Sequence, residues 1–247
     1  MISLRIEGPV AVATLSRPPV NAIDEGWIAR LQEVLGMAAD ARVLLMRSNQ
    51  RAFSAGADLA LMRSRFDSAA GRAQMVEFAR AMQRAYAQLE ASPLVSIAEI
   101  GGAAMGGGLE LALACDFRIA SDTARLGLPE ARLGLLPGAG GTQRLTRLCG
   151  EATAKRLILG AEVVDGKEAA RLGLLQWAVA PDELAARAQG LAADLALLPV
   201  ASLTACKRCI AAARGEDGFE MELAATGALL GSEDTQGRVR AFLEKRR

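Results

Sequence analysis

The chain has 247 residues, of which 51% are hydrophobic and 23% charged, so it can bury a large core and is no disordered tail protein. Its net charge is only +1, with 29 basic and 28 acidic residues scattered along the chain, which argues against nucleic acid as the main partner. The chain contains no histidine, which excludes histidine-dependent triads and HExxH metal sites and leaves acid/base chemistry mainly to carboxylates.

The first half of the sequence predicts strands and helices in alternation. Apolar residues alternate on either side of Gly8, which indicates a hairpin, and Asp24 can cap the helix that follows. Two short apolar strands each end in a turn of small residues, at 53–58 and 101–108. In chain order we expect a hairpin at 4–16, a helix at 24–37, a strand at 43–46, a helix at 69–90, a strand at 94–100, a helix at 109–114 and a strand at 117–120.

This order is typical of βαβ units in an α/β fold. In such units ligands bind beyond the carboxyl ends of the strands, where helix starts offer free N–H groups. We therefore expect the functional site at the turns 53–58 and 101–108. From residue 142 onward the pattern is almost entirely helical. The residues expected to cap or begin helices there are Thr142, Asp165, Pro199 and Ser232.

The apolar stretches of the sequence bear on location. Residues 1–10 contain no charged segment leading into an apolar run, and two acidic residues, Glu110 and Asp116, interrupt the most apolar stretch, at 103–120. We therefore expect a cytoplasmic protein with no membrane span.

The four cysteines do not suggest a secreted disulfide framework in a chain of this length. Cys206 and Cys209 have the CxxC spacing of a redox or metal pair. The helical pattern around them favours two packed thiols instead. We therefore expect no metal site.

The glycine-rich stretch at 101–108 (GGAAMGGG) does not match a common nucleotide motif, because no Lys-Ser/Thr pair follows it and the GxGxxG spacing is missing. Gly107 and Gly108 lack a Cβ and would let a ligand approach N–H groups at a helix start, where the helix dipole makes them better donors. Such donors can stabilise an oxyanion. Tight packing of the helix on a sheet explains the same glycines equally well.

Glu110 and Glu130 are the candidate acid/base residues. Glu110 falls in the first turn of a predicted helix, where a carboxylate often serves only the helix N–H groups, yet it is the only charge within 100–115. Pro129 would begin a helical turn with Glu130 near its start, where Glu130 could simply pair with Arg132. If this segment is buried, its apolar neighbours would raise the pKa of Glu130 toward the range of a general acid or base.

Three motifs together resemble those of the crotonase superfamily of enoyl-CoA hydratases and isomerases. They are AFSAGADL at 52–59, GGGLELALACD at 106–116 and GLPEARLGLLPGAGGT at 127–142. The resemblance spans nearly the whole chain, from LSRP at 15–18 and NAI at 21–23 to RAFLEK at 240–245. It implies a crotonase-like core of repeated ββα units in a superhelix at 1–190 and a C-terminal helical trimerisation lobe at 191–247.

The resemblance also implies how the substrate is held. In that family two backbone N–H groups bind the acyl-CoA carbonyl, and by motif position these belong to Ala57 and Gly107. Each such donor is worth ~3 kcal/mol to the enolate that forms at the thioester. The backbone around Ala55 would meet the adenine. The residues that would line the pantetheine and thioester are Ala57, Asp58, Leu59, Ala60 and Gly107. Coenzyme A is part of the substrate, and no further cofactor is implied.

Hydratases of this family carry two glutamates, and Glu110 and Glu130 fill both positions here, which favours water addition. Both would orient the water, Glu110 would chiefly help to activate it, and Glu130 would exchange the proton at the α-carbon. A double-bond isomerase using chiefly Glu130, or another crotonase-type acyl-CoA reaction, is the alternative. A few relatives bind RNA, so an RNA-binding protein is a remote alternative that the near-neutral charge disfavours.

Phe242 and Lys245 match positions that in relatives reach the adenine and 3′-phosphate, commonly of a neighbouring subunit, so we expect a homotrimer or a dimer of trimers. A basic helix end that complements the helix dipole explains Lys245 equally well. Ala60 and Ile100 depart from the family pattern, which commonly has a long residue such as lysine and an asparagine there. Residues 61–75, which shape the acyl pocket in relatives, match no recognisable pattern, so the sequence does not predict the acyl-chain length.

Overall fold

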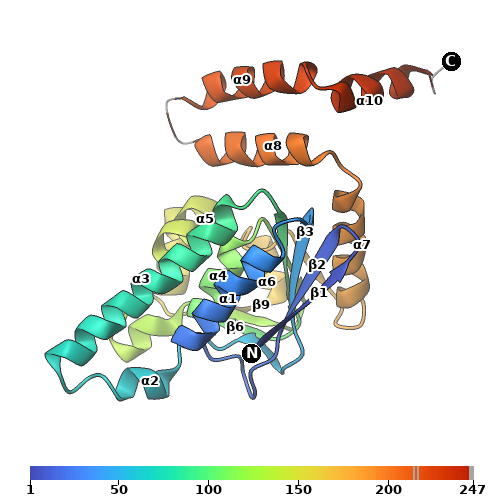
Figure 1. Cartoon of the computed structure of the whole chain (residues 1–247). Coiled ribbons are helices and arrows are strands. Elements are labelled where there is room, and N and C mark those ends of the chain that lie inside the picture. Colours follow the sequence, from blue (N-terminus) through green and yellow to red (C-terminus); the bar gives the residue numbers. More distant parts are fainter. Residues whose placement is uncertain (214, 216, 245–247) are drawn as a thin grey trace. The chain divides into compact units, whose positions relative to one another are not determined.

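The computed structural model describes residues 1–213, 215 and 217–244 (Figure 1). The chain divides into two compact units, Met1–Ala193 and Asp194–Arg247. No single helix in the described ranges is long and apolar enough to cross a membrane, and α7 (Leu184–Ala196) with α8 (Val200–Ala212) meets that test only as a bent pair.

The first unit contains a six-stranded sheet in the order β1-β2-β3-β5-β7-β10. The hairpin predicted around Gly8 is confirmed, and every other neighbouring pair in this sheet is parallel. Residues 43–46 are all buried, because helices or the second sheet cover the central strands of a parallel sheet on both faces. The strands are β1 (Ile2–Glu7), β2 (Val10–Leu15), β3 (Val43–Ser48), β5 (Val95–Ile100), β7 (Phe117–Ser121) and β10 (Trp177–Val179).

A smaller sheet lies in the same unit, in the order β4-β6-β8-β9. Its strands are β4 (Ala52–Ser54), β6 (Ala103–Met105), β8 (Arg125–Gly127) and β9 (Val163–Asp165). Each of β4, β6 and β8 follows a strand of the larger sheet within a few residues and precedes a helical segment, so the chain repeats a ββα unit three times. Parallel pairing of β4 with β6 and of β6 with β8 brings the ends of these three strands to one edge.

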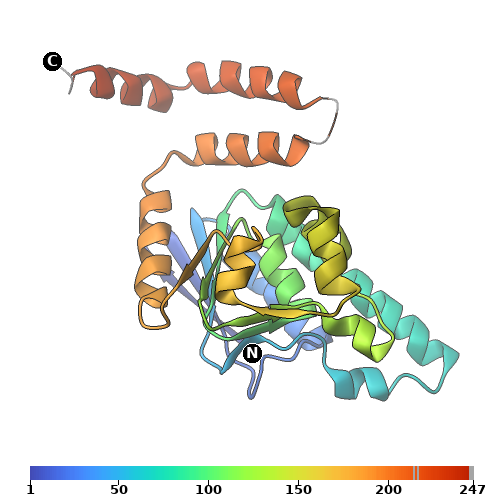
Figure 2. The same cartoon turned by 180° about the vertical axis from the view of Figure 1, so that it is seen from behind.

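Several helices of the first unit lie on one side of the larger sheet. Both views show α1, α3, α4 and α5 there (Figures 1 and 2). As predicted, Asp24 caps α1, accepting a hydrogen bond from Trp27 N at 2.8 Å. The helical segments are α1 (Glu25–Met37), α2 (Leu59–Arg63), α3 (Ala69–Ala91), α4 (Gly107–Ala114), a 3₁₀ turn (Pro129–Leu133), α5 (Gly141–Ile158) and α6 (Gly166–Arg171).

Two expectations for helix starts and one for the chain beyond residue 142 need correction. Thr142 does not cap α5, which begins at Gly141 with no side-chain cap, because the N–H of Gly141 donates to a carboxylate from another segment. Helix α4 begins at Gly107, two residues before the expected start. The chain beyond residue 142 is less helical than expected, since it includes β9 and β10. Asp165 does cap α6, accepting from the N–H of Glu168 at 2.8 Å.

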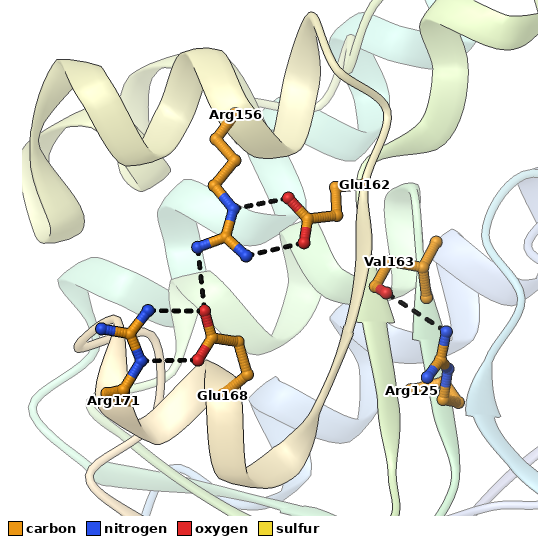
Figure 3. Close-up of polar contacts among 6 residues, drawn as sticks. All are labelled: Arg125, Arg156, Glu162, Val163, Glu168 and Arg171. Carbon is orange, nitrogen blue, oxygen red and sulfur yellow. Dashed lines mark hydrogen bonds and ion pairs between the residues drawn. The ribbon is translucent and has the colours of Figure 1, made fainter.

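A network of exposed ion pairs joins the end of α5 to α6 and to the segment that enters β9 (Figure 3). Arg156 donates to both oxygens of Glu162 at 2.5 and 2.7 Å and to Glu168 at 2.8 Å. Arg171 donates to both oxygens of the same Glu168 at 2.6 and 2.7 Å. Because β9 pairs with β8, this network supports the strand that leads into the 3₁₀ turn carrying Glu130.

In the part of the second unit that the structure describes, three helices follow the end of α7, and none of the three has a buried residue. They are α8, α9 (Gly218–Leu230) and α10 (Glu233–Glu244). Pro199 and Ser232 precede α8 and α10 as predicted, and Ser232 Oγ accepts from Thr235 N at 3.2 Å. Cys206 is exposed on α8, so the expectation of two packed thiols is wrong for Cys206, because these helices alone enclose no core.

Candidate active site

Glu110 lies in helix α4, all of whose residues are buried, and is itself only 2% exposed. Its Oε1 accepts hydrogen bonds from the N–H groups of Ala139 and Gly141, both at 2.7 Å. These donors belong to the loop at 137–141 that leads into α5. Glu110 is therefore held by the start of another helix. The interpretation that it serves the N–H groups of its own helix is wrong.

The environment of Glu110 raises its pKa to about 7. Burial is the largest cause, and the negative charge of Glu130 adds to it. The two backbone N–H groups and the positive charge of Arg144 favour the ionised form and act in the opposite direction. The carboxyl group can therefore gain and lose a proton near neutral pH.

Glu130 lies in the 3₁₀ turn Pro129–Leu133, where the sequence predicted a helical turn. Burial raises its pKa. The residues that follow it, 131–136, are exposed, so the expectation that apolar neighbours bury this segment on both sides is wrong. Its Oε2 is buried with no hydrogen-bond partner, and within the described residues Glu130 makes no ion pair with Arg132. Its Oε1 lies so close to Gly106 that a Cβ added at position 106 would be only 2.8 Å from it. Gly106 also has a φ of 51°, which side chains rarely adopt, so both the space and the backbone conformation require glycine here. Glu130 thus presents an unsatisfied carboxyl oxygen beside the start of α4.

The N–H groups of Ala57 and Gly107 lie at the ends of the adjacent strands β4 and β6. The two amide groups are neighbours. A Cβ atom added to Gly107 would lie 3.6 Å from Ala57 N, and one added to Gly56 would lie 3.0 Å from Gly107 N. Gly107 is the first residue of α4, so its N–H has no acceptor within the helix. Ile23 N donates to Gly56 O, and Asp58 N donates to Ile23 O, both at 2.8 Å. Ile23 thus binds the peptides on both sides of Ala57, and the N–H of Ala57 points away from Ile23.

The direction of each N–H group is fixed by the carbonyl of its own peptide. Gly56 O, in the peptide of Ala57 N, accepts from Ile23 N at 2.8 Å. Gly106 O, in the peptide of Gly107 N, accepts from Glu110 N at 2.9 Å. Because a trans peptide is planar, its C=O and N–H point in opposite directions. Both N–H groups are therefore oriented before any ligand binds.

Tyr86 contributes a contact that sequence reasoning missed. Its hydroxyl, on helix α3, donates to Gly107 O at 2.9 Å in the buried interior. Burial and the charge of Glu110 raise the pKa of Tyr86 well above its usual value, so the hydroxyl stays a donor. The spacing of Phe78, Met82 and Leu89 on α3 predicts that Tyr86 faces the core, but it does not reveal this partner.

The side chain of Asp58 makes its contacts within the protein. Its Oδ1 accepts from Ala60 N and Leu61 N at 2.9 and 3.3 Å, and so caps helix α2. Its Oδ2 pairs with Arg17 at 3.2 Å, and Arg17 also pairs with Asp24 at 2.8 Å. The carboxylate of Asp58 therefore fixes the start of α2 next to Ala57.

The other expected binding residues lie in two places. Ala55, Leu59 and Ala60 are exposed on either side of Ala57, and Leu59 is 58% exposed. Phe242 lies on α10 of the second unit and is 59% exposed. Lys245 lies outside the described residues. The structure thus brings Glu110, Glu130, Ala57 and Gly107 together. Throughout the described ranges, no group of three or more Cys, Asp or Glu could hold a metal ion.

Comparison with known proteins identifies the family of the chain. The family described as enoyl-CoA hydratase/isomerase matches residues 5–247. A "probable enoyl-CoA hydratase" of Bacillus subtilis is 38% identical over 100% of this chain and 96% of that protein. The "short-chain-enoyl-CoA hydratase" of Clostridium acetobutylicum is 36% identical over 100% of this chain and 95% of that protein.

Solved structures share the fold as well. DspI of Pseudomonas aeruginosa superimposes with a TM-score of 0.92 at 38% identity, covering 99% of this chain and 94% of that one. Both the repeated ββα core and the C-terminal helices are within the matched length. The chain has the crotonase fold and belongs to the enoyl-CoA hydratase/isomerase family.

Proposed function

We propose that this protein is a cytoplasmic enoyl-CoA hydratase that adds water across the 2,3 double bond of 2-enoyl-CoA thioesters to give 3-hydroxyacyl-CoA. One observation carries the proposal. Two carboxyl groups with raised pKa, the buried Glu110 and the partly buried Glu130, lie beside two oriented main-chain N–H groups, those of Ala57 and Gly107. The names of relatives such as the short-chain-enoyl-CoA hydratase of Clostridium acetobutylicum support the same reaction class.

The N–H groups of Ala57 and Gly107 would hold the thioester carbonyl oxygen. When water adds at the β-carbon, negative charge develops on this oxygen as the enolate forms. The dipole of α4 strengthens the donor at Gly107, and each oriented donor is worth ~3 kcal/mol in such a site. This arrangement stabilises the enolate more than the neutral thioester, as catalysis requires.

The two glutamates would divide the proton transfers. Ionised Glu110 takes a proton from water while the water oxygen bonds to the β-carbon, and protonated Glu130 gives its proton to the α-carbon on the same side. Two N–H donors favour the ionised form of Glu110, and burial raises the pKa of Glu130 and favours its protonated form, so the interacting pair shares one proton. A proton passing from Glu110 to Glu130 restores the starting state. The reaction is redox-neutral, and the proposal includes no cofactor beyond the CoA of the substrate.

Coenzyme A would extend along the surface next to Ala57. We propose that the backbone of Ala55 meets the adenine and that the segment 57–60 lines the pantetheine, with the side chain of Asp58 serving to cap α2. Phe242 and Lys245 would bind the adenine and 3′-phosphate, from the same or a neighbouring subunit.

We further propose that the protein is a homotrimer or a dimer of trimers. Large apolar side chains are exposed on the helices of the second unit, including Ile210 at 75%, Phe219 at 82% and Leu223 at 66%. So many exposed apolar groups in one small unit are typical of an interface.

A double-bond isomerase is the alternative, because Glu130 could by itself move a proton at the α-carbon of a bound thioester. Product analysis with 2-enoyl-CoA and 3-enoyl-CoA separates the two reactions. The hydratase forms 3-hydroxyacyl-CoA from the 2-enoyl substrate, and the Glu110→Gln variant provides the matched background. Movement of the double bond without any hydroxylated product would contradict the proposal, and salt-sensitive RNA retention without thioester turnover would replace it with RNA binding.

A further inference from the structure

The loop at 137–141 holds Glu110, and side chains from outside the loop hold its peptides in turn. Gln83 Nε2, on helix α3, donates to Gly138 O at 2.7 Å. This carbonyl belongs to the same peptide as the N–H of Ala139, which donates to Glu110 at 2.7 Å. Because that peptide is planar and trans, Gln83 and Glu110 bind its two opposite sides. The contact with Gln83 therefore fixes the direction of a hydrogen bond to the carboxylate.

Arg144 holds the next peptide of the loop. Its Nη1 donates to Ala139 O at 3.0 Å, and its Nε and Nη2 donate to Glu90 at 3.0 and 2.8 Å. The side chain of Arg144 is only 11% exposed. Arg144 therefore connects the loop to Glu90 on α3, the helix that also carries Gln83.

We propose that Gln83 and Arg144 are positioning residues for Glu110, holding the loop at 137–141 so that Ala139 and Gly141 bind the carboxylate in one geometry. The inference rests on the proposed function in that Glu110 is taken as the base that activates water. Neither Gln83 nor Arg144 reaches the N–H groups proposed to hold the thioester.

The charge of Arg144 gives this arrangement a second effect. The titratable groups that face Glu110 are Glu130 from the 3₁₀ turn, Tyr86 from α3 and Arg144 from α5. Arg144 is the one cation among them and lowers the pKa of Glu110, while Glu130 raises it. Glu90 pairs with Arg144 and is half exposed. Loss of Arg144 therefore raises the pH at which Glu110 ionises.

Three variants and one control test the proposal. Arg144→Met removes the charge and the donors, Arg144→Lys keeps the charge without the planar fork, and Gln83→Met removes only the donor to Gly138 O. The control is Arg80→Met, which breaks an exposed ion pair between Arg80 and Glu77 on the same helix α3. Each is measured for kcat, KM, the pH profile of kcat/KM and thermal unfolding. The titration of Glu110 is followed by ¹³C NMR of labelled glutamate carboxyl groups, assigned with Glu110→Gln.

We expect Gln83→Met and Arg144→Met to lower kcat by about 10- to 100-fold with KM little changed, as displacement of a catalytic group does. In Arg144→Met, Glu110 titrates at higher pH and the acid limb of kcat/KM moves the same way. Arg144→Lys restores most of the pH profile but only part of kcat. Arg80→Met behaves as wild type. If Arg144→Met does not fold, Gln83→Met still carries the test through kcat.

The proposal is overturned if Gln83→Met keeps wild-type kcat, or if a folded Arg144→Met leaves the titration of Glu110 unchanged. It is also overturned if Arg80→Met causes an equal loss of kcat. The NMR titration needs no substrate. If the wild-type protein does not hydrate enoyl-CoA and Glu110 nevertheless responds to Arg144→Met, the proposed function fails while the positioning of Glu110 by Arg144 stands.

Discussion

Glu110 and Gly141 are joined by a 2.7 Å hydrogen bond across 31 positions of sequence, from the carboxylate of helix α4 to the first N–H of helix α5. The positive end of the α5 dipole therefore faces the carboxylate. It opposes the effect of burial, and the pKa of Glu110 reaches about 7. The contact keeps a buried acid able to ionise at neutral pH.

Replacing either glutamate with its amide should abolish most of the activity. We expect Glu110→Gln and Glu130→Gln each to lower kcat for 2-enoyl-CoA hydration by at least ~100-fold, the lower bound for losing a general acid or base. Steady-state kinetics with purified variants checks this, with circular dichroism as the control for folding. Near-full activity in either variant would show that its role has been misassigned.

The rate should depend on pH through Glu110. Its ionised form is the proposed base, so kcat/KM should rise as the pH increases through about 7, and it should fall again at higher pH, where Glu130 loses the proton that it donates. Because Glu130 raises the pKa of Glu110, Glu130→Gln should make Glu110 ionise at lower pH. A pH–rate profile of the wild type and an NMR titration of the Glu130→Gln variant test the two statements. A shift to higher pH in the variant would mean that the two carboxyl groups do not interact as described.

Removing the hydroxyl of Tyr86 should destabilise the protein. In Tyr86→Phe the buried Gly107 O keeps its hydrogen bond within helix α4 but loses its second donor, and a lost hydrogen bond costs about 0.5–1.5 kcal/mol of unfolding free energy. Because Gly107 begins α4, kcat should also fall. Urea unfolding followed by fluorescence measures the first effect and steady-state kinetics the second. An unchanged unfolding free energy would mean that the hydrogen bond from Tyr86 to Gly107 O adds no stability.

A charge on the exposed face of α9 should disrupt assembly. Phe219 is 82% exposed, and Phe219→Glu would place a charge within an apolar interface, which is costly to bury. Light scattering after size-exclusion chromatography should show a trimer or hexamer for the wild type and smaller species for the variant. Glu222→Gln on the same helix is the matched control. A monomeric wild-type protein would remove the basis of the assembly proposal.

The long elements could be predicted because their patterns are long enough to carry a period. Helix α3 shows a helical apolar stripe over 23 residues, and β3 begins with a continuous apolar run at 43–46. Strands β4, β6 and β8 have three residues each, too few to show any alternation, and they exist because they pair with one another. The smaller sheet therefore could not be predicted from local pattern.

The candidate site was predictable only in part, because several of its contacts come from backbone groups and tertiary structure. The family resemblance predicts Glu110 and Glu130, and their types and spacing are visible in the sequence. Backbone donors such as those of Ala139 and Gly141 leave no signature in residue type. The start of α5 was misplaced at Thr142 because its first N–H is satisfied by Glu110, a contact that only the tertiary structure creates.

The order of strands in the larger sheet has a consequence for how activity arises during folding. Glu130, Glu110 and Ala57 come from three successive ββα units, and the parallel pairs β3–β5 and β5–β7 join strands far apart in the chain. Such non-local pairings form slowly, because the connecting chain must lose conformational entropy before the contacts between the strands stabilise the pair. In addition, a nascent chain that ends at Glu110 does not yet contain the start of α5 that binds this carboxylate. The proposed active site can form only after the later units have been synthesised and have folded.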